Sequence, residues 1–190
     1  AGDRPRLQLD ATQTAADIAP FGLTPQGYVV MAPGAEFGPA KRWPTAYFGE
    51  VARRLSVDRG LRTVLLGSGK EASLCDEIQA CCPDAQNSAG KTQLQQALSI
   101  IAASKNVVSN DSGLMHVAAA FGVPQVAVFG SSSPLHTPPL NDKAQVLWLK
   151  SDANYQPELA CAPCFERECA LGHTRCLNDI RPAQVLTALG

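Results

Sequence analysis

The sequence predicts an α/β domain with one parallel sheet, because strand-like and helical segments alternate along almost all of its 190 residues. Short apolar runs have the length of buried strands, and segments with helical apolar spacing separate them. Several loops that follow these runs are rich in glycine and serine, as at the carboxyl edge of a sheet that binds a ligand. We therefore expect a Rossmann-like sheet with helices on both faces.

The strands and helices are expected in regular alternation. Apolar, partly β-branched runs predict strands at residues 28–31, 62–66, 106–109, 125–129 and 144–149. Helical spacing predicts helices at residues 12–21, 44–55, 71–81, 94–103, 113–121 and 182–189. Pro44 takes a first helical position, and Leu94, Leu98 and Ile101 share one face of their helix.

The expected organisation is a leading segment followed by one domain. Residues 1–22 read as a linker and a leading helix, and residues 23–190 as a single domain with a cysteine-rich tail. The first residue is Ala1 rather than methionine, which suggests a piece of something longer. The domain has the size at which one hydrophobic core is stable.

Charge and hydropathy exclude several classes of partner. The 16 basic residues are balanced by 17 acidic ones, and no concentrated positive face is indicated for nucleic acid. No apolar stretch approaches the length of a bilayer span, and no signal-peptide pattern opens the chain. We expect no nucleic acid partner and no transmembrane segment.

The most informative motif joins the strand at residues 106–109 to the helix that follows. Asn110, Asp111 and Ser112 precede Gly113, and His116 lies one turn into the helix. Unpaired N–H groups and the positive end of the helix dipole make such a turn a site for phosphate. The plainer alternative is an ordinary helix whose side chains only cap its first turn.

Four loops should meet at one edge of the sheet: residues 32–43, 67–70, 110–113 and 130–133. Neither the dinucleotide fingerprint G-x-G-x-x-G nor a P-loop lysine motif occurs in them. Nicotinamide chemistry and kinase-like hydrolysis of a nucleoside triphosphate are therefore disfavoured.

Two cations in the first of these loops indicate an anion. Lys41 and Arg42 stand at the positive end of the helix that follows, where cations are unfavourable unless an anion lies between. We expect Lys41 to meet phosphate and Arg42 to face solvent, and the plainer alternative is a pair of solvated surface cations. Glu36 in the same loop is either an exposed acid or a ligand for a sugar hydroxyl.

Two blocks carry a resemblance to a known family. Residues 31–44 read MAPGAEFGPAKRWP, and residues 109–120 read SNDSGLMHVAAA. These blocks resemble the signatures of the lipopolysaccharide heptosyltransferases of glycosyltransferase family 9, and they are most similar to its type II branch. The resemblance implies the C-terminal, donor-binding half of a GT-B enzyme that inverts configuration while moving heptose from ADP-heptose to the lipopolysaccharide inner core.

The resemblance also implies roles for particular residues. Lys41 and Asp111 are the catalytic candidates that it places at the diphosphate and the sugar. The donor-binding candidates are Gly34, Ala35, Lys41, Thr92, Asp111, Ser112, Gly113 and His116. Thr92 falls where the family approaches adenine, and residues 67–70 fall at the ribose, where no carboxylate occurs before Glu71.

The remaining expectations concern metals, the missing acceptor domain and the cellular location of the protein. No Asp-x-Asp occurs, so we expect no cofactor and no metal, with Lys41 and backbone N–H groups stabilising the leaving diphosphate. The general base and the acceptor site belong to a missing N-terminal domain in this resemblance. It also implies a cytoplasmic protein that acts at the inner membrane face, with peripheral attachment left open.

Four of the seven cysteines lie in the tail: Cys161, Cys164, Cys169 and Cys176. Their C-x2-C-x4-C-x6-C spacing is compatible with tetrahedral zinc, with disulfides or with free thiols. An odd number of cysteines and no secretion signal favour a reducing compartment.

Two other functions stay open beside the donor domain. A sugar-nucleotide 2-epimerase of the same fold also binds a nucleotide sugar between two domains, but it would lack the block that ends in Trp43-Pro44. A non-catalytic nucleotide-binding module is the alternative from another class.

Overall fold

The computed structural model describes residues 4–190, which form one six-stranded parallel sheet. The strand order is β3-β2-β1-β4-β5-β6, so the chain first builds outwards in one direction and then crosses back past β1 to build in the other. This is the doubly wound arrangement, and it confirms the predicted fold class. The strands are β1 (Tyr28–Ala32), β2 (Arg62–Leu65), β3 (Gln86–Asn87), β4 (Asn106–Asn110), β5 (Gln125–Val128) and β6 (Ala144–Leu147).

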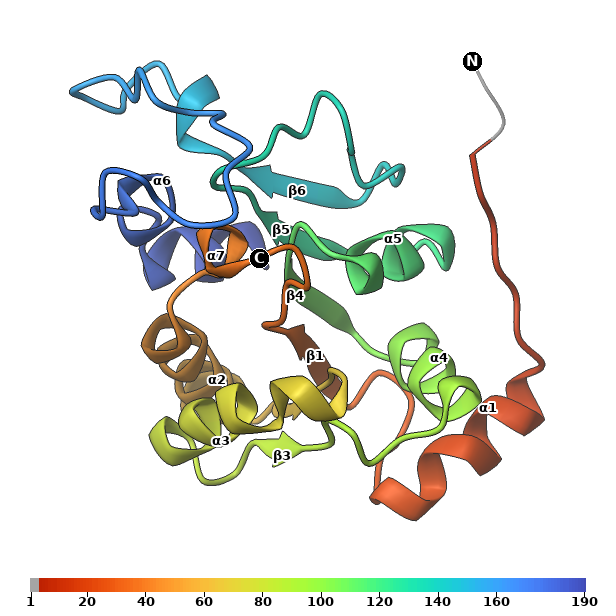
Figure 1. The fold of residues 1–190 in the computed structure, drawn as a ribbon. Helices are drawn as coiled ribbons and strands as arrows, with labels where there is room; N and C mark the ends of the chain where they lie inside the picture. Colours follow the sequence, from red (N-terminus) through yellow and green to blue (C-terminus); the bar gives the residue numbers. More distant parts are fainter. Residues whose placement is uncertain (1–3) are drawn as a thin grey trace.

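Helices cover both faces of the sheet (Figure 1). They are α1 (Ala11–Ile18), α2 (Thr45–Arg59), α3 (Ala72–Cys81), α4 (Leu94–Ala102), α5 (Gly113–Ala120), α6 (Arg175–Asn178) and α7 (Pro182–Ala188). Short 3-10 turns occur at η1 (Ala19–Phe21), η2 (Pro39–Lys41), η3 (Gly69–Glu71) and η4 (Leu149–Ser151). Within residues 4–190, no helix has both the length and the apolar character needed to cross a membrane.

The core consists of two layers, one on each face of the sheet. Alternate residues of β1 point to opposite faces. Val29 and Met31 pack with α2, α3 and α7, whereas Tyr28 and Val30 pack with α1, α4 and α5. All five residues of β1 are buried, as expected for a strand covered on both sides.

The leading segment lies against the domain. The Asp17 carboxylate of α1 accepts hydrogen bonds from Ser99 Oγ at 2.6 Å and from Gln95 Nε2 at 3.2 Å, both on α4. The backbone N–H of Leu7 donates to the carbonyl of Ala120 at 2.9 Å. The side chain of Ile18, the last residue of α1, adds to this contact because it is buried in the core with residues of α4.

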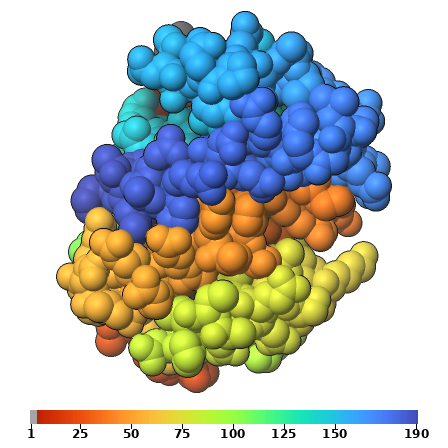
Figure 2. All heavy atoms as spheres, turned by 90° about the vertical axis from the view of Figure 1, so that its left-hand side faces the viewer, coloured from red at the N-terminus to blue at the C-terminus, as the bar shows by residue number. Residues whose placement is uncertain are grey.

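The C-terminal segment covers the start of α2. Figure 2 shows this segment in blue, directly against the orange residues of the first loop and of α2. Trp43 Nε1 donates to the carbonyl of Ile180 at 2.8 Å, and the hydroxyl of Tyr47 donates to the carbonyl of Asn178 at 3.2 Å. The C-terminal segment thus packs against the first loop as part of the fold.

Two sequence expectations need correction. The edge strand β3 is missing from the prediction, because its two residues, Gln86 and Asn87, are polar and too few to show a period. Leu94 was expected on the apolar face of α4, but its side chain is 78% exposed. It is the first residue of the helix, and the contact with the sheet begins only one turn later, where Leu98 is partly buried and Ile101 is fully buried.

Candidate functional site

Asn110 ties together the loops that follow β1 and β4. Its side chain is fully buried, and its Nδ2 donates to the carbonyl of Pro33 at 2.7 Å. Its Oδ1 accepts from the backbone N–H of Trp43 at 3.0 Å. One amide therefore fixes both ends of the first loop against the carboxyl end of β4, which confirms that these two loops meet at one edge of the sheet.

The two catalytic candidates form an ion pair at this edge. Lys41 Nζ lies 2.6 Å from Asp111 Oδ2, and the two side chains are only 18% and 6% exposed. Thr137, in the loop after β5, donates to the other carboxylate oxygen of Asp111 at 3.4 Å. Because an ion pair shielded from water is strengthened by its surroundings, Lys41 is held in place next to the start of α5.

The first turn of α5 is not capped by a side chain. Ser112 is the N-cap residue, with an extended backbone, but no side chain accepts a hydrogen bond from the first turn. Asn110 and Asp111 are engaged with the first loop instead. Space is open next to Gly113, where an added Cβ would meet no atom within 4 Å. The capping explanation of this motif is therefore wrong, and the helix N-terminus remains available to a ligand.

A cleft of about 690 Å³ lies in front of this helix N-terminus. Five of the predicted donor-binding residues line it: Gly34, Ala35, Thr92, Ser112 and Gly113. Lys41 and Asp111 lie beside the cleft, because each directly precedes a residue that lines it and an ion pair joins the two side chains. His116 is exposed on α5, one turn beyond Gly113, and does not line the cleft. The structure thus brings together all the predicted site residues except His116.

Glu71 provides the carboxylate that residues 67–70 lack. Its Oε2 accepts hydrogen bonds from the backbone N–H of Ser68 at 2.7 Å and from Ser68 Oγ at 3.0 Å. Its other oxygen lies against Gly34, where an added Cβ would come within 1.5 Å of it. Glu71 therefore lines the cleft between the first two loops, and a side chain at position 34 would displace its carboxylate from this position.

Two arginines also line this cleft. Arg42 was expected to face solvent, but its guanidinium donates to the carbonyl of Ala35 from Nε at 3.4 Å and from Nη2 at 3.2 Å. Arg167, from the cysteine-rich tail, was not predicted as a site residue. No local pattern could indicate it, because its place depends on the tail folding back over the first loop.

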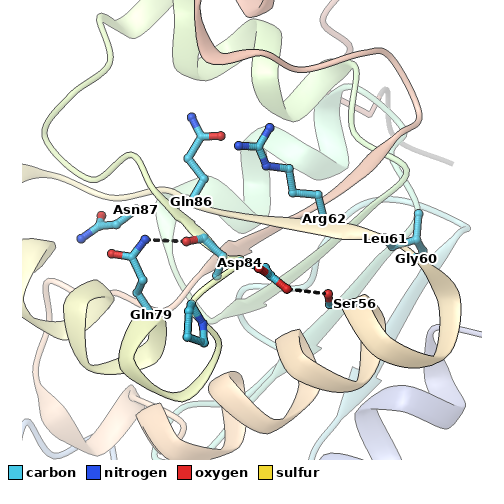
Figure 3. Close-up of a pocket in the computed structure, with 10 residues that line it drawn as sticks. Ser56, Gly60, Leu61, Arg62, Gln79, Asp84, Gln86 and Asn87 are labelled. Atoms are coloured by element: carbon cyan, nitrogen blue, oxygen red, sulfur yellow. Dashed lines mark hydrogen bonds between the residues drawn. The ribbon is translucent and has the colours of Figure 1, made fainter.

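A second cavity, of about 600 Å³, lies at the opposite edge of the sheet (Figure 3). Arg62 and Gln86 line it, and each is the first residue of its strand. Asp84 accepts a hydrogen bond from Ser56 at 3.3 Å, and Gln79 donates to the carbonyl of Ala85 at 2.6 Å (Figure 3). Since ligands of doubly wound sheets bind at the carboxyl ends of the strands, the cleft at Gly113 is the better candidate.

The cysteines of the tail are free thiols, as are the other three. Within residues 4–190, no three His, Cys, Asp or Glu side chains are arranged to hold a metal ion. The backbone N–H of Thr174 donates to Cys169 Sγ at 3.5 Å and lowers the pKa of this thiol. Burial, followed by the neighbouring thiols, raises the pKa of Cys176 to about 11.

Protein purified without a metal-affinity tag is expected to contain no stoichiometric zinc and to show unequal thiol reactivity. Because the thiolate is the nucleophile, Cys169 should be alkylated by iodoacetamide at pH 8 well before Cys176. Cys75 is a matched slow control, since burial raises its pKa to about 12. Metal analysis and mass spectrometry of a time course measure both. One zinc per chain, with all four tail thiols protected until a chelator is added, would contradict this expectation.

Comparison with known proteins gives one consistent result. The model of glycosyltransferase family 9 (heptosyltransferase) matches residues 1–175. Lipopolysaccharide heptosyltransferase 2 of Escherichia coli is 42% identical over 194 residues, covering 97% of this chain and 52% of that protein. Lipooligosaccharide heptosyltransferase 2 of Haemophilus influenzae is 37% identical over 196 residues, covering 98% of this chain and 54% of that protein. The chain therefore spans about half the length of the curated relatives it matches.

Solved structures agree with these relatives. The structure of E. coli ADP-heptose LPS heptosyltransferase II has a TM-score of 0.80 and 41% identity, covering 97% of this chain and 52% of that one. A family 9 glycosyltransferase of Veillonella parvula has a TM-score of 0.76 at 24% identity, covering 96% of this chain and 52% of that one, and supports the fold. Because the family model matches residues 1–175 and the identity to a curated heptosyltransferase extends over 97% of the chain, the chain belongs to glycosyltransferase family 9, the heptosyltransferases.

Proposed function

We propose that this chain is the donor-binding domain of a glycosyltransferase that moves heptose from ADP-heptose to the lipopolysaccharide inner core. The observation that carries the proposal is the uncapped N-terminus of α5, which opens into the cleft beside the Lys41–Asp111 pair. Backbone N–H groups and an ammonium are the groups that bind a diphosphate. The relatives named above, which carry heptosyltransferase names, point to the same donor and acceptor.

The mechanism follows from the charge that develops on the leaving group. Breaking the bond between sugar and phosphate builds negative charge on the diphosphate of ADP. Lys41 can exchange its Asp111 oxygen for a phosphate oxygen, while the α5 N-terminus stabilises the same charge. These groups supply the stabilisation from the protein itself, so we propose a metal-independent reaction without a cofactor.

The rest of the donor fits the remaining walls of the cleft. Glu71 is placed to accept a hydrogen bond from a ribose hydroxyl, and Thr92 lines the part that we assign to adenine. Asp111, once released by Lys41, is available to a hydroxyl of the heptose. In this arrangement His116 approaches the donor only if α5 or the cleft adjusts on binding, since its side chain is exposed in the structure.

Inversion of configuration requires a base on the face of the sugar opposite to the leaving group. Asp111 directly precedes the α5 N-terminus that we assign to the diphosphate, so we assign the base and the acceptor site to an N-terminal acceptor domain. Such a domain would account for the half of the relatives' length that this chain does not cover. The reaction would take place in the cytoplasm at the inner membrane face, where the acceptor is anchored.

The 190-residue chain by itself is expected to bind ADP but to transfer no heptose. Donor contacts come from one wall of the site, whereas transfer also needs the acceptor, its base and a closed cleft that aligns them. Isothermal titration with ADP, UDP, GDP and NAD should give the tightest binding for ADP. Equal or absent binding of all four would contradict the proposed function. Transfer by this chain alone would instead place the base within it, and His116 would be the first residue to replace.

A further inference from the structure

The cysteine-rich tail folds back over the edge of the cleft. The backbone N–H of Phe165 donates to the carbonyl of Ser131 at 2.8 Å, in the loop after β5. Two residues later, the carbonyl of Arg167 accepts a hydrogen bond from the N–H of Ala40 at 3.1 Å. The main chain of the tail is thus fixed at two of the loops that form the site.

The first loop leaves room for this contact only because it carries a glycine. An added Cβ at Gly38 would lie 2.4 Å from the carbonyl oxygen of Arg167, too close for any other residue without a backbone shift. The approach of the two backbones fixes the Cα of Arg167 beside the cleft, and Arg167 lines this cleft together with Gly34 and Ala35.

The guanidinium of Arg167 lies over the ring of Phe37, as does the ammonium of Lys41. Its Cζ is 5.4 Å from the centroid of the Phe37 ring, and Lys41 Nζ is 5.0 Å from the same centroid. Two cations thus share one aromatic ring at the edge of the site. A cation over an aromatic face is held in place without losing its charge.

The two cations of the first loop are already engaged. Lys41 is paired with Asp111, and Arg42 donates to the carbonyl of Ala35. Among residues 4–190, Arg167 has neither an ion pair nor a side-chain hydrogen bond within the chain. Its five N–H donors are therefore available to an anion that enters the cleft.

We infer that Arg167 is a donor-binding residue, whose guanidinium contacts the diphosphate of the nucleotide sugar from the side of the tail. The inference rests on the proposed function, since the anion is the diphosphate of the donor. A diphosphate suits a guanidinium because its oxygens accept two parallel hydrogen bonds. The cysteine-rich tail thereby acquires a role in binding as well as in the fold.

The test compares ADP with adenosine, which shares the nucleoside but has no phosphate. Isothermal titration is carried out on the whole chain and on Arg167→Gln, with Arg53→Gln as a control. Arg53 is exposed on α2, does not line the cleft, and its replacement makes the same change in net charge. Arg167→Gln should weaken ADP binding about three- to tenfold, because it loses a charge-assisted hydrogen bond that exposure to water weakens. It should leave adenosine binding unchanged. Arg53→Gln should change neither.

Arg167→Lys is a second test, because lysine keeps the positive charge but lacks the planar guanidinium that donates two parallel hydrogen bonds. Its ADP affinity should lie between those of the unchanged chain and Arg167→Gln. Unchanged ADP binding by Arg167→Gln would overturn this inference alone, and so would an equal loss for ADP and adenosine, which indicates a structural role. If the unchanged chain bound ADP no better than adenosine, the proposed function would fail first and this inference with it.

Discussion

Replacing Trp43 by alanine is expected to lower the free energy of unfolding by about 3–5 kcal/mol. Its side chain is 1% exposed and packs edge-on against Phe48, with the ring centroids 4.9 Å apart. Its Nε1 donates to the carbonyl of Ile180, which joins the C-terminal segment to the first loop. Alanine would leave both a cavity and a buried carbonyl without its donor. Urea unfolding followed by circular dichroism measures the change.

Trp148 supplies a matched control for the hydrogen bond. Its Nε1 is also buried but has no partner among the described residues, so Trp148→Phe removes an N–H group that stabilises nothing in the fold. Trp43→Phe removes a paired N–H and should cost about 1–3 kcal/mol more than Trp148→Phe. Equal costs for the two phenylalanine variants would show that the contact with Ile180 adds little to stability.

The main elements of the fold could be predicted because each has a regular apolar period. The strand at Tyr28–Ala32 and the helix at Thr45–Arg59 lie within a few residues of their expected limits. The elements that were missed are short. The edge strand at Gln86–Asn87 and the single turn at Arg175–Asn178 have too few residues for a period, and neighbouring parts of the fold determine their conformation.

The site was predictable where its residues are neighbours in the sequence. Asp111, Ser112 and Gly113 stand together in one turn, so their chemistry can be read directly. Arg167 was not assigned, because it reaches the cleft through a contact between distant segments, whereas Glu71 is held at the cleft by its near neighbour Ser68. Arg42 differs from its expected exposure because the irregular loop folds back on itself, so that the guanidinium donates to the carbonyl of Ala35.

Replacing Lys41 by alanine is expected to weaken ADP binding by about 1–3 kcal/mol, which corresponds to roughly a fivefold to 150-fold rise in Kd. The ammonium lies beside the cleft and next to the helix N-terminus that we assign to the diphosphate. Arg42→Ala should cost less, because Arg42 acts on the donor only through the loop that it supports. Isothermal titration of the two variants decides between them. Equal small losses would mean that Lys41 pairs with Asp111 but does not contact the diphosphate.

Asp111→Asn distinguishes binding from stability in the same pair. Without a competing carboxylate, Lys41 is free for the diphosphate, so Asp111→Asn should bind ADP at least as tightly as the unchanged chain. Lys41→Ala instead leaves a carboxylate that is only 6% exposed without its partner, and should also destabilise the fold. Adding Asp111→Ala to Lys41→Ala removes that buried charge, so the double variant should regain stability but not ADP affinity. If both properties returned together, the loss of binding by Lys41→Ala would be a consequence of the distorted loop, and Lys41 would have no direct contact with the donor.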